Sequence, residues 1–263
     1  MSLRRTRFTR HIAGWSAAML AVGMVFAAPN AGADTSPAPG DPETVSATPL
    51  PTVQINGVVW SQAVIGNTVY AGGEFTQARP AGAPAGSSQT ARANLLAYDI
   101  RTGQLLSSWV ANTNGVVRVV RAAPDGSRLY VGGSFTQVNG QTIRRIAALN
   151  PTTGAPVASF NPNPDATVRA IAVTSGTVYF GGGFGSVGGQ GRAKLAAARV
   201  SDGAVLNWAP NAQGGDVWAM ASSPDGGQVL AGGSFTSMNG STNPGGGMAS
   251  LDAVTGANRP WAS

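Results

Sequence analysis

The sequence predicts an all-β chain made of repeated antiparallel sheets, and two sets of repeated landmarks carry this prediction. A Gly-Gly-x-Phe segment recurs as VYAGGEF (69–75), LYVGGSF (129–135), VYFGGGF (178–184) and VLAGGSF (229–235). The phenylalanines of these segments are 60, 49 and 51 residues apart. A second aromatic landmark follows each segment, at Trp109, Phe160, Trp208 and Trp261, with spacings of 51, 48 and 53 residues. Two landmarks with one period indicate a structural repeat.

Turn signals divide each repeat into short strands. In the second copy, Asp125-Gly126, Asn139-Gly140 and Thr153-Gly154 separate runs that are apolar or β-branched. Asp-Gly and Asn-Gly supply the positive φ that tight hairpin turns need, so three hairpins are predicted to join four antiparallel strands. Residues 79–92, rich in Pro, Gly and Ser, lengthen the first spacing and predict a surface loop. No long helical period appears after residue 34.

A meander of this size, apolar on both faces, cannot bury itself and must be sandwiched between like neighbours. The expected architecture is therefore a β-propeller of about four blades, each a four-stranded antiparallel sheet. The approximate blades are residues 52–111, 112–162, 163–210 and 211–263. The Gly-Gly pairs are predicted to let backbones approach closely, and the aromatic landmarks to fill the wedges between blades.

Three closures are compatible with four blades. The first is a closed four-bladed ring, the second is part of a larger propeller of about seven blades, and the third is an open arc completed by self-association. We favour the larger propeller slightly over the closed ring. An uncapped arc would expose an apolar blade face and strand edges.

The first 51 residues predict export. Arg4, Arg5, Arg7 and Arg10 precede an apolar run from Ile12 to Ala28 and the small residues at 31–33, so residues 1–33 are expected to be a signal peptide. An uncleaved membrane anchor and a twin-arginine signal are the alternatives. Residues 34–51 hold five prolines and no apolar period, which predicts an extended linker. The expected location is secreted or at the cell surface, with no membrane contact beyond the export signal.

Composition excludes several kinds of chemistry. The chain has no Cys and one His, His11, which leaves with the leader, so neither a thiolate nucleophile nor a Cys/His metal site is expected. Four of the seventeen basic residues also leave, and the remaining thirteen against eleven acidic residues give a net charge of +2. These cations are scattered along the sequence, so no nucleic-acid partner is expected. We expect no cofactor, no metal and no enzymatic activity.

The candidate ligand site is a ring of four side chains. Each predicted innermost strand begins with Val and a large residue, which places Trp60, Arg118, Arg169 and Trp218 at equivalent positions. Such a ring could stack sugar or aromatic faces and bind carboxylate or phosphate through bidentate hydrogen bonds. The alternative is that these side chains pack between blades, with the arginine stems covering apolar surface.

Other polar residues are expected to be structural. Asn112, Asn163 and Asn211 are predicted to form Asx-turns between blades, and Asp125 and Asp225 to lie in hairpin turns. Asp99 and Asp252 match each other but align with Asn150 and Arg199 in the other copies. Only Glu74 and Asp216 remain as a conceivable pair of carboxylates for glycoside hydrolysis.

The segment DGSRLYVGGSFTQVNGQTIRRIAALNPTTGAPVASFNP (125–162) closely resembles the delta-60 repeat of secreted and cell-surface bacterial proteins, and the resemblance extends over residues 52–263. Kelch repeats are a more distant resemblance. Both imply a propeller outside the cell that binds or displays and has no common catalytic set. Secreted kelch-type copper oxidases use His and Cys, which the mature chain lacks.

Two functions are therefore weighed. The first is a non-enzymatic binding or scaffold module, with an extracellular protein or a glycan as its partner. The alternative is an extracellular carbohydrate-active enzyme that uses carboxylates at the channel mouth. A structural spacer is not distinguishable from the first by sequence.

Overall fold

The apolar runs of the repeats form antiparallel strands, and the all-β prediction is confirmed for the described residues. The structure is a computed structural model that describes residues 51–243 and 245–260, and these contain no helix. Contacts divide the chain into two units, Met1–Pro49 and Leu50–Ser263. The predicted signal peptide at 1–33 and nearly all of the predicted linker at 34–51 lie outside the described residues.

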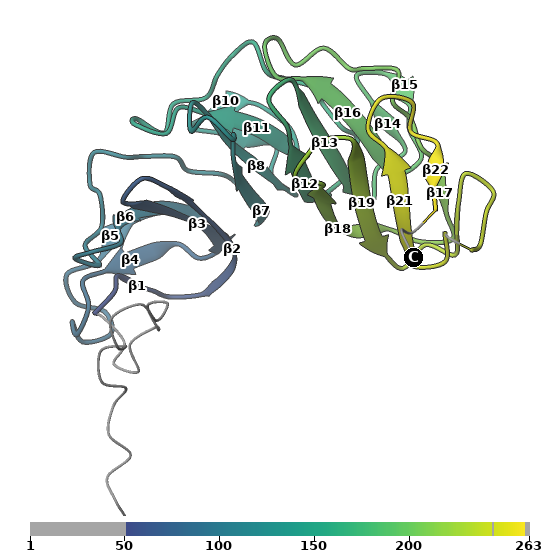
Figure 1. The fold of residues 1–263 in the computed structure, drawn as a ribbon. Helices are drawn as coiled ribbons and strands as arrows, with labels where there is room; N and C mark the ends of the chain where they lie inside the picture. The colour runs from purple at the N-terminus through teal and green to yellow at the C-terminus, as the bar shows by residue number, and fades with distance from the viewer. Residues whose placement is uncertain (1–50, 244, 261–263) are drawn as a thin grey trace, which may run out of the picture. The chain divides into compact units, whose positions relative to one another are not determined.

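Four larger sheets follow one another along the chain (Figure 1). The first sheet contains β2 (Val58–Ile65), β3 (Thr68–Glu74) and β6 (Leu95–Asp99). The second contains β7 (Val117–Ala122), β8 (Leu129–Gly133) and β11 (Ile146–Leu149), and the third β12 (Val168–Val173), β13 (Thr177–Gly182) and β16 (Leu195–Arg199). The fourth contains β18 (Val217–Ser222), β19 (Gln228–Gly233), β21 (Met248–Asp252) and β22 (Asn258–Arg259).

Short strands form small sheets beside the larger ones. They are β1 (Gln54–Ile55) with β4 (Gln77–Arg79) and β5 (Thr90–Ala91), β9 (Gln137–Val138) with β10 (Gln141–Thr142), β14 (Ser186–Val187) with β15 (Gln190–Gly191), and β17 (Ala212–Gln213) with β20 (Ser237–Met238). The Asn139-Gly140 turn, with φ of 48° and 78°, closes the β9–β10 hairpin. It was expected to join two strands of a larger sheet directly, and that expectation is wrong because β8 and β11 pair around it.

The prediction of four strands in every repeat is also wrong. The first three sheets have three strands, and the expected fourth strand is reduced to single bridges, Tyr98↔Leu105, Leu149↔Pro156 and Ala198↔Val205. In the first two repeats the chain turns directly after this bridge. The N–H of Trp109 donates to Leu106 O, and the N–H of Phe160 donates to Val157 O. In the fourth sheet, hydrogen bonds of Asn258 and Arg259 hold β22 extended.

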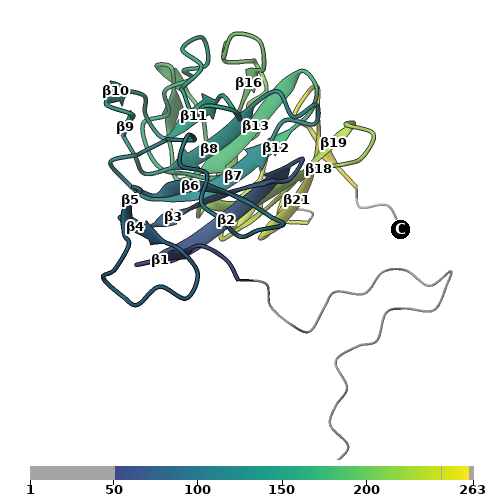
Figure 2. The same ribbon diagram turned by 90° about the vertical axis from the view of Figure 1, so that its left-hand side faces the viewer.

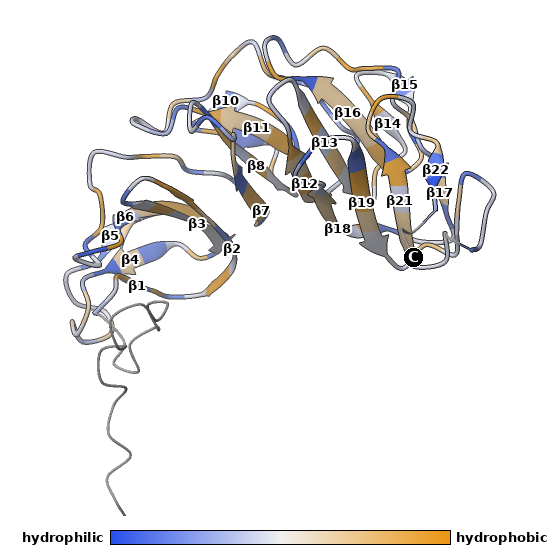
Figure 3. Cartoon of the chain, in the orientation of Figure 1, coloured by the Kyte–Doolittle hydropathy of each residue, from blue (hydrophilic) through white to orange (hydrophobic). Residues whose placement is uncertain are grey.

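Successive sheets pack face to face in chain order. The inner strand of each sheet contacts both the inner and the second strand of the sheet before it: β7 contacts β2 and β3, β12 contacts β7 and β8, and β18 contacts β12 and β13. Three buried apolar cores fill these interfaces. Figure 2 shows the sheets from the side, and Figure 3 shows apolar colour along β11, β16 and β21.

The aromatic landmarks Trp109, Phe160 and Trp208 fill the interfaces as expected, and Trp261 lies outside the described residues. Trp109 meets Tyr70 edge to face at 5.4 Å between ring centroids, Phe160 meets Tyr130 at 5.1 Å and Trp208 meets Tyr179 at 5.0 Å. Edge-to-face pairs add a little stability beyond the area they bury. Two tyrosine hydroxyls also cross to the next repeat, where Tyr70 donates to Pro151 O and Tyr179 to Ala253 O.

A β-bulge interrupts the inner strand of every larger sheet at the same position. The register shifts between Val59 and Ser61, Val117 and Val119, Val168 and Ala170, and Val217 and Ala219. The residue left without a partner in each case is one of the predicted ring residues: Trp60, Arg118, Arg169 and Trp218. The Gly-Gly pair lies directly opposite each bulge. A bulge re-aims one side chain, so it presents these four in the same way.

The two glycines of each pair answer different steric demands. A Cβ on the second glycine would lie about 2 Å from a backbone carbonyl oxygen at or just before the start of the bulged strand, as at Gly182, 2.0 Å from Thr167 O. In the first three sheets, a Cβ on the first glycine would strike the next sheet, as at Gly132, 2.7 Å from Val168 Cγ1. The predicted close approach of two backbones is therefore found at the second glycine. The first glycine leaves room for a valine methyl group of the next sheet.

The four sheets do not close on themselves in the described residues. β2 and β18, the first and last inner strands, do not pack against each other as the consecutive inner strands do. The closed four-sheet ring, one of the three predicted closures, is thus not formed by the described chain.

The bulge makes a prediction about stability. Gly182→Ala should destabilise the protein by about 3 kcal/mol, because its Cβ meets backbone that cannot rotate away. Gly176→Ala is the matched control, since a Cβ there meets nothing within 4 Å, and it should change stability by less than about 0.5 kcal/mol. Urea unfolding of both variants measures the difference. Equal stabilities would contradict the role assigned to the glycine.

Candidate functional site

The four predicted ring residues lie together. Trp60, Arg118, Arg169 and Trp218 line one hollow of about 250 Å³, to which each of the four repeats contributes one residue. The common bulge brings them there, because each occupies the same place on an inner strand. The sequence prediction that these positions are equivalent therefore agrees with the geometry.

The two tryptophans are not packed between sheets, which was the alternative interpretation. Trp60 is 51% exposed and Trp218 is 59% exposed. The guanidinium carbon of Arg118 lies 5.0 Å from the centroid of the Trp60 ring, a cation–π contact. The indole of Trp60 is thus held against a cation while half of its surface stays accessible.

An acidic residue lies beside the ring. Asp216, directly before β18, forms ion pairs with Arg169 (Nε to Oδ2, 3.5 Å) and Lys194 (Nζ to Oδ1, 3.8 Å). Lys194 has a φ of 71° and also donates to Gly183 O at 2.8 Å. The Asp216 carboxylate therefore pairs with two cations, and Arg118 is a further cation of the ring. Lys194 was not among the predicted site residues, and no sequence signal linked it to Arg169.

Glu74 and Asp216, the conceivable catalytic pair, lie in different surroundings. Glu74 lines a separate hollow of about 400 Å³ together with Asn56, Phe75 and Asn94. Asp216 is engaged by Arg169 and Lys194. The structure does not bring the two carboxylates together in one hollow.

Most other described acids serve turns, as predicted for Asp125 and Asp225. The Asp125 carboxylate accepts from the N–H of Ser127, and that of Asp225 from the N–H of Gly227. Asp99 accepts from the N–H groups of Arg101 and Thr102 and forms a 2.9 Å ion pair with Arg101. The Arg101 guanidinium and these N–H groups lower the pKa of Asp99 to about 2.

The same turn recurs with other residues at the position of Asp99. Asn150 accepts from the N–H groups of Thr152 and Thr153, and Asp252 from those of Val254 and Thr255. The pKa of Asp252 is lowered by these N–H groups and by Arg259. An amide and a carboxylate make the same turn, so these acids have a structural use.

The Asx-turn prediction for the three interblade asparagines is wrong for Asn112. Its side-chain oxygen accepts from the N–H of Ala93, nineteen residues earlier in the chain, at 2.8 Å. Its own N–H donates to the side chain of Asn139, and the N–H of Asn211 donates to Asn239 in the same way. Asn163 instead adopts a positive φ of 57°. These residues join loops that are distant in sequence, which spacing does not reveal.

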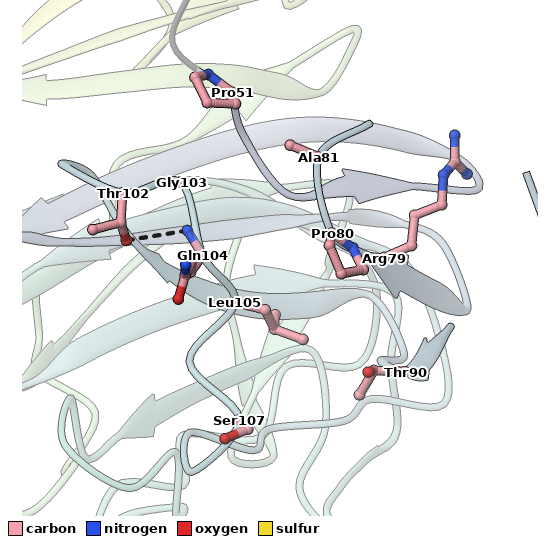
Figure 4. Close-up of a pocket in the computed structure, with 10 residues that line it drawn as sticks. All are labelled: Pro51, Arg79, Pro80, Ala81, Thr90, Thr102, Gly103, Gln104, Leu105 and Ser107. Atoms are coloured by element: carbon pink, nitrogen blue, oxygen red, sulfur yellow. Dashed lines mark hydrogen bonds between the residues drawn. The ribbon is translucent and has the colours of Figure 1, made fainter. Parts of the chain in front are cut away.

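A larger hollow of about 500 Å³ lies at the first repeat (Figure 4). It is lined on one side by Arg79, Pro80 and Ala81 from the loop inserted at 79–92, and on the other by the turn at 102–104. The guanidinium of Arg79 points away from the other lining residues in Figure 4, and its Nε donates to Gln54 Oε1 and Ala83 O. This hollow therefore offers few charged groups to a ligand.

The described residues contain neither a candidate metal cluster nor a membrane-spanning helix. No group of three or more His, Cys, Asp or Glu residues in 51–243 and 245–260 could hold a metal ion. Within the same ranges, there is no helix with the length and apolar character needed to cross a bilayer.

Comparison with known proteins adds little. No protein-family model and no curated protein matches the chain. Among solved structures, it is similar to the computationally designed Ika4 protein, with 14% identity, a TM-score of 0.47, and coverage of 75% of this chain and 92% of that one. It is also similar to the computationally designed Ika8 protein, with 15% identity and a TM-score of 0.44, over 76% of this chain and 60% of that one. Neither TM-score reaches 0.5, so neither similarity bears on function.

The turn carboxylates make a prediction about acid stability. Because the pKa of Asp99 is lower in the folded than in the unfolded chain, the stability it contributes is present above its ordinary pKa of about 3.9 and is lost as the pH falls through about 2. Asp99→Asn keeps the acceptor oxygen but does not titrate. Urea unfolding should show the variant less stable than the wild type at pH 6, with the difference shrinking towards zero at pH 2. A difference independent of pH would contradict this.

Proposed function

We propose that this chain is an exported, non-enzymatic binding or scaffold module, that its four sheets are blades of a β-propeller type, and that the inner ring binds an anionic glycan. The observation that carries the proposal is the convergence of Trp60, Arg118, Arg169 and Trp218 in one hollow. Each of the four repeats contributes one large side chain, at its bulge, to the same hollow.

The packing of the sheets supports the interpretation as blades. The inner strands β7, β12 and β18 each pack against the sheet before them, and the first three sheets each bury one face against the next sheet. This nearest-neighbour burial is what a repeat architecture requires. It also leaves the inner strands side by side, where the residues of successive bulges share a surface.

The ring chemistry favours a ligand with both flat apolar faces and negative charge. The exposed indoles of Trp60 and Trp218 suit stacking against the C–H face of a sugar, and a guanidinium can bind a carboxylate through two parallel hydrogen bonds. Arg169 and Lys194 both pair with the carboxylate of Asp216, and Arg118 lies over the Trp60 ring. A glycan that carries uronate groups meets both requirements.

Export is supported by the sequence of the first 51 residues and by the absence of Cys. A leader, a proline-rich linker and repeated sheets suit a module that is held away from its point of attachment. Display outside the cell would give the ring access to glycans.

The rival function, a carbohydrate-active enzyme, has less support. A general acid for glycosidic cleavage needs a raised pKa. Each described Asp whose pKa departs from the usual value has a lowered pKa, held down by backbone N–H groups and by nearby Ser or Arg side chains. Five of these acids form turns, and Asp165 accepts from Gly185 and Ser186 of a distant loop. Glu74 and Asp216, the conceivable catalytic pair, lie in different surroundings, which favours the binding module.

Ligand binding is tested by calorimetric titration of the exported protein with oligogalacturonate and with its neutral galactose counterpart. Only the acidic oligosaccharide should bind. Arg118→Ala and Trp218→Ala should each weaken binding about tenfold, corresponding to about 1.4 kcal/mol. Arg144→Ala removes an exposed arginine outside the ring and should bind as the wild type does. Equal binding of both sugars, or equal losses in all three variants, would contradict the site.

Export is tested by expressing the full chain in a secreting bacterial host. Mass spectrometry of the protein in the medium or envelope fraction should show a new N-terminus at Asp34, because the small residues at 31–33 suit signal peptidase. Replacing Arg4 and Arg5 with lysine separates the two export routes. A chain that keeps Met1 would contradict the cleavage.

A further inference from the structure

Nothing in residues 51–243 and 245–260 covers one face of the fourth sheet. We call the face that a sheet turns to the next sheet along the chain its following face. On the following faces of the first three sheets, Leu95, Ile146 and Leu195 are fully buried, with 0% exposure. Met248, the equivalent residue of the fourth sheet, is 58% exposed. Ala219 is exposed too, although Val119 and Ala170 at its position are buried.

This uncovered face keeps the form of the covered ones. Gly72, Gly132 and Gly181 each accept a valine methyl from the next sheet, with Cγ1 only 2.6–2.7 Å from where their own Cβ would lie. Gly232 occupies the same place in the fourth sheet, and a Cβ there would meet nothing closer than Ala219 Cβ at 3.9 Å. The fourth sheet thus presents a glycine recess without its valine.

The first sheet carries the complementary residues. On its other face, here called its preceding face, Val59 stands at the position of Val117, Val168 and Val217, the three valines that fill glycine recesses. Val59 is only partly buried, and Val64 on the same face of β2 is 52% exposed. On β3 and β6, Ala71 and Leu96 of this face are buried in a small cluster with Val53, Phe75 and Ala78. The part of the face that stays accessible is therefore on β2.

We propose that a second copy of this chain covers the fourth sheet by docking its first sheet there, head to tail. The partner's β2 would contact β18 and β19, just as β7 contacts β2 and β3 within one chain. The partner's Val59 would enter the recess at Gly232. Because every copy carries both faces, two copies can close into one ring through two identical interfaces.

The interface is weaker than those inside the chain. Gln62 on β2 is exposed and stands where Val120 and Ile171 are fully buried and Met220 nearly so. Docking would bury the Gln62 amide among apolar side chains, which costs free energy unless it is hydrogen-bonded. Association is therefore reversible and depends on concentration.

Self-association would also extend the ring of bulge residues. Within the chain, the residues of consecutive bulges are neighbours, as in the contact of Trp60 with Arg118. The same packing would place Trp218 beside the partner's Trp60. The hollow would then be completed by the partner's four side chains.

Sedimentation equilibrium of the exported protein over a concentration series tests the proposal. The wild type should fit a monomer–dimer equilibrium. Gly232→Ala fills the recess and should weaken the dimer at least tenfold, while Gln62→Val should strengthen it at least tenfold. Gly191→Ala is the matched control, because a Cβ there also meets nothing within 4 Å, and it should leave the equilibrium unchanged.

Several outcomes would overturn the proposal: a wild type that stays monomeric at every concentration, a dimer that is indifferent to both substitutions, or open-ended growth beyond the dimer. Urea unfolding and circular dichroism of Gly232→Ala check that its fold is intact, and Gln62→Val tests the interface by a gain that misfolding cannot mimic. Arg118→Ala should keep the wild-type dimer, which separates self-association from glycan binding.

Discussion

The β-bulge opposite the Gly-Gly pair is the constraint on which the rest of the structure depends. The bulge pushes a carbonyl towards the second strand, and only a glycine leaves room for it, as at Gly133 opposite Val116 O. One residue earlier, Gly132 leaves room for Val168 of the next sheet. The bulged residue itself, here Arg118, is turned towards the ring. The bulge and the Gly-Gly pair opposite it therefore determine the strand pairing, the stacking of the next sheet and the direction of the site residue.

Because each sheet is complementary to its neighbours through the bulge and the Gly-Gly pair, stability is built from nearest-neighbour interfaces. The burial of Tyr70, Tyr130 and Tyr179 against the next repeat's structure shows the rule, and Leu230, their equivalent in the fourth sheet, is only partly buried. Such an architecture has no internal reason to stop at four sheets. The first sheet's preceding face and the fourth sheet's following face are each one half of such an interface. Whether these two faces are covered decides whether the ring residues form part of a ring or a complete one.

Polar residues divide into two groups with different uses. Asp99, Asn150 and Asp252 satisfy turn N–H groups, and substitution between amide and carboxylate leaves the turn intact. Around the hollow, Lys194 follows the repeat, because Arg145 has the same positive φ and donates to the equivalent backbone carbonyl. Asp216 does not: it stands where the other copies have Val58, Val116 and Thr167. The charge of the ring therefore arises from individual substitutions on a uniform frame, a pattern suited to tuning what the frame binds.

The repeat, the Gly-Gly strands, the positions of the Asn-Gly and Asp-Gly turns and the equivalence of Trp60, Arg118, Arg169 and Trp218 are predictable from the sequence, because these depend on local backbone preferences and on period. The stacking of the sheets reveals that the fourth strand shrinks to a bridge in three repeats, that Asn112 bonds to Ala93, and that Lys194 and Asp216 border the ring. These features depend on which distant segments meet once the sheets have stacked. Local propensity does not indicate which distant segments meet. A bulge adds one residue to a strand and redirects its side chain, and the hydrophobic pattern does not show this.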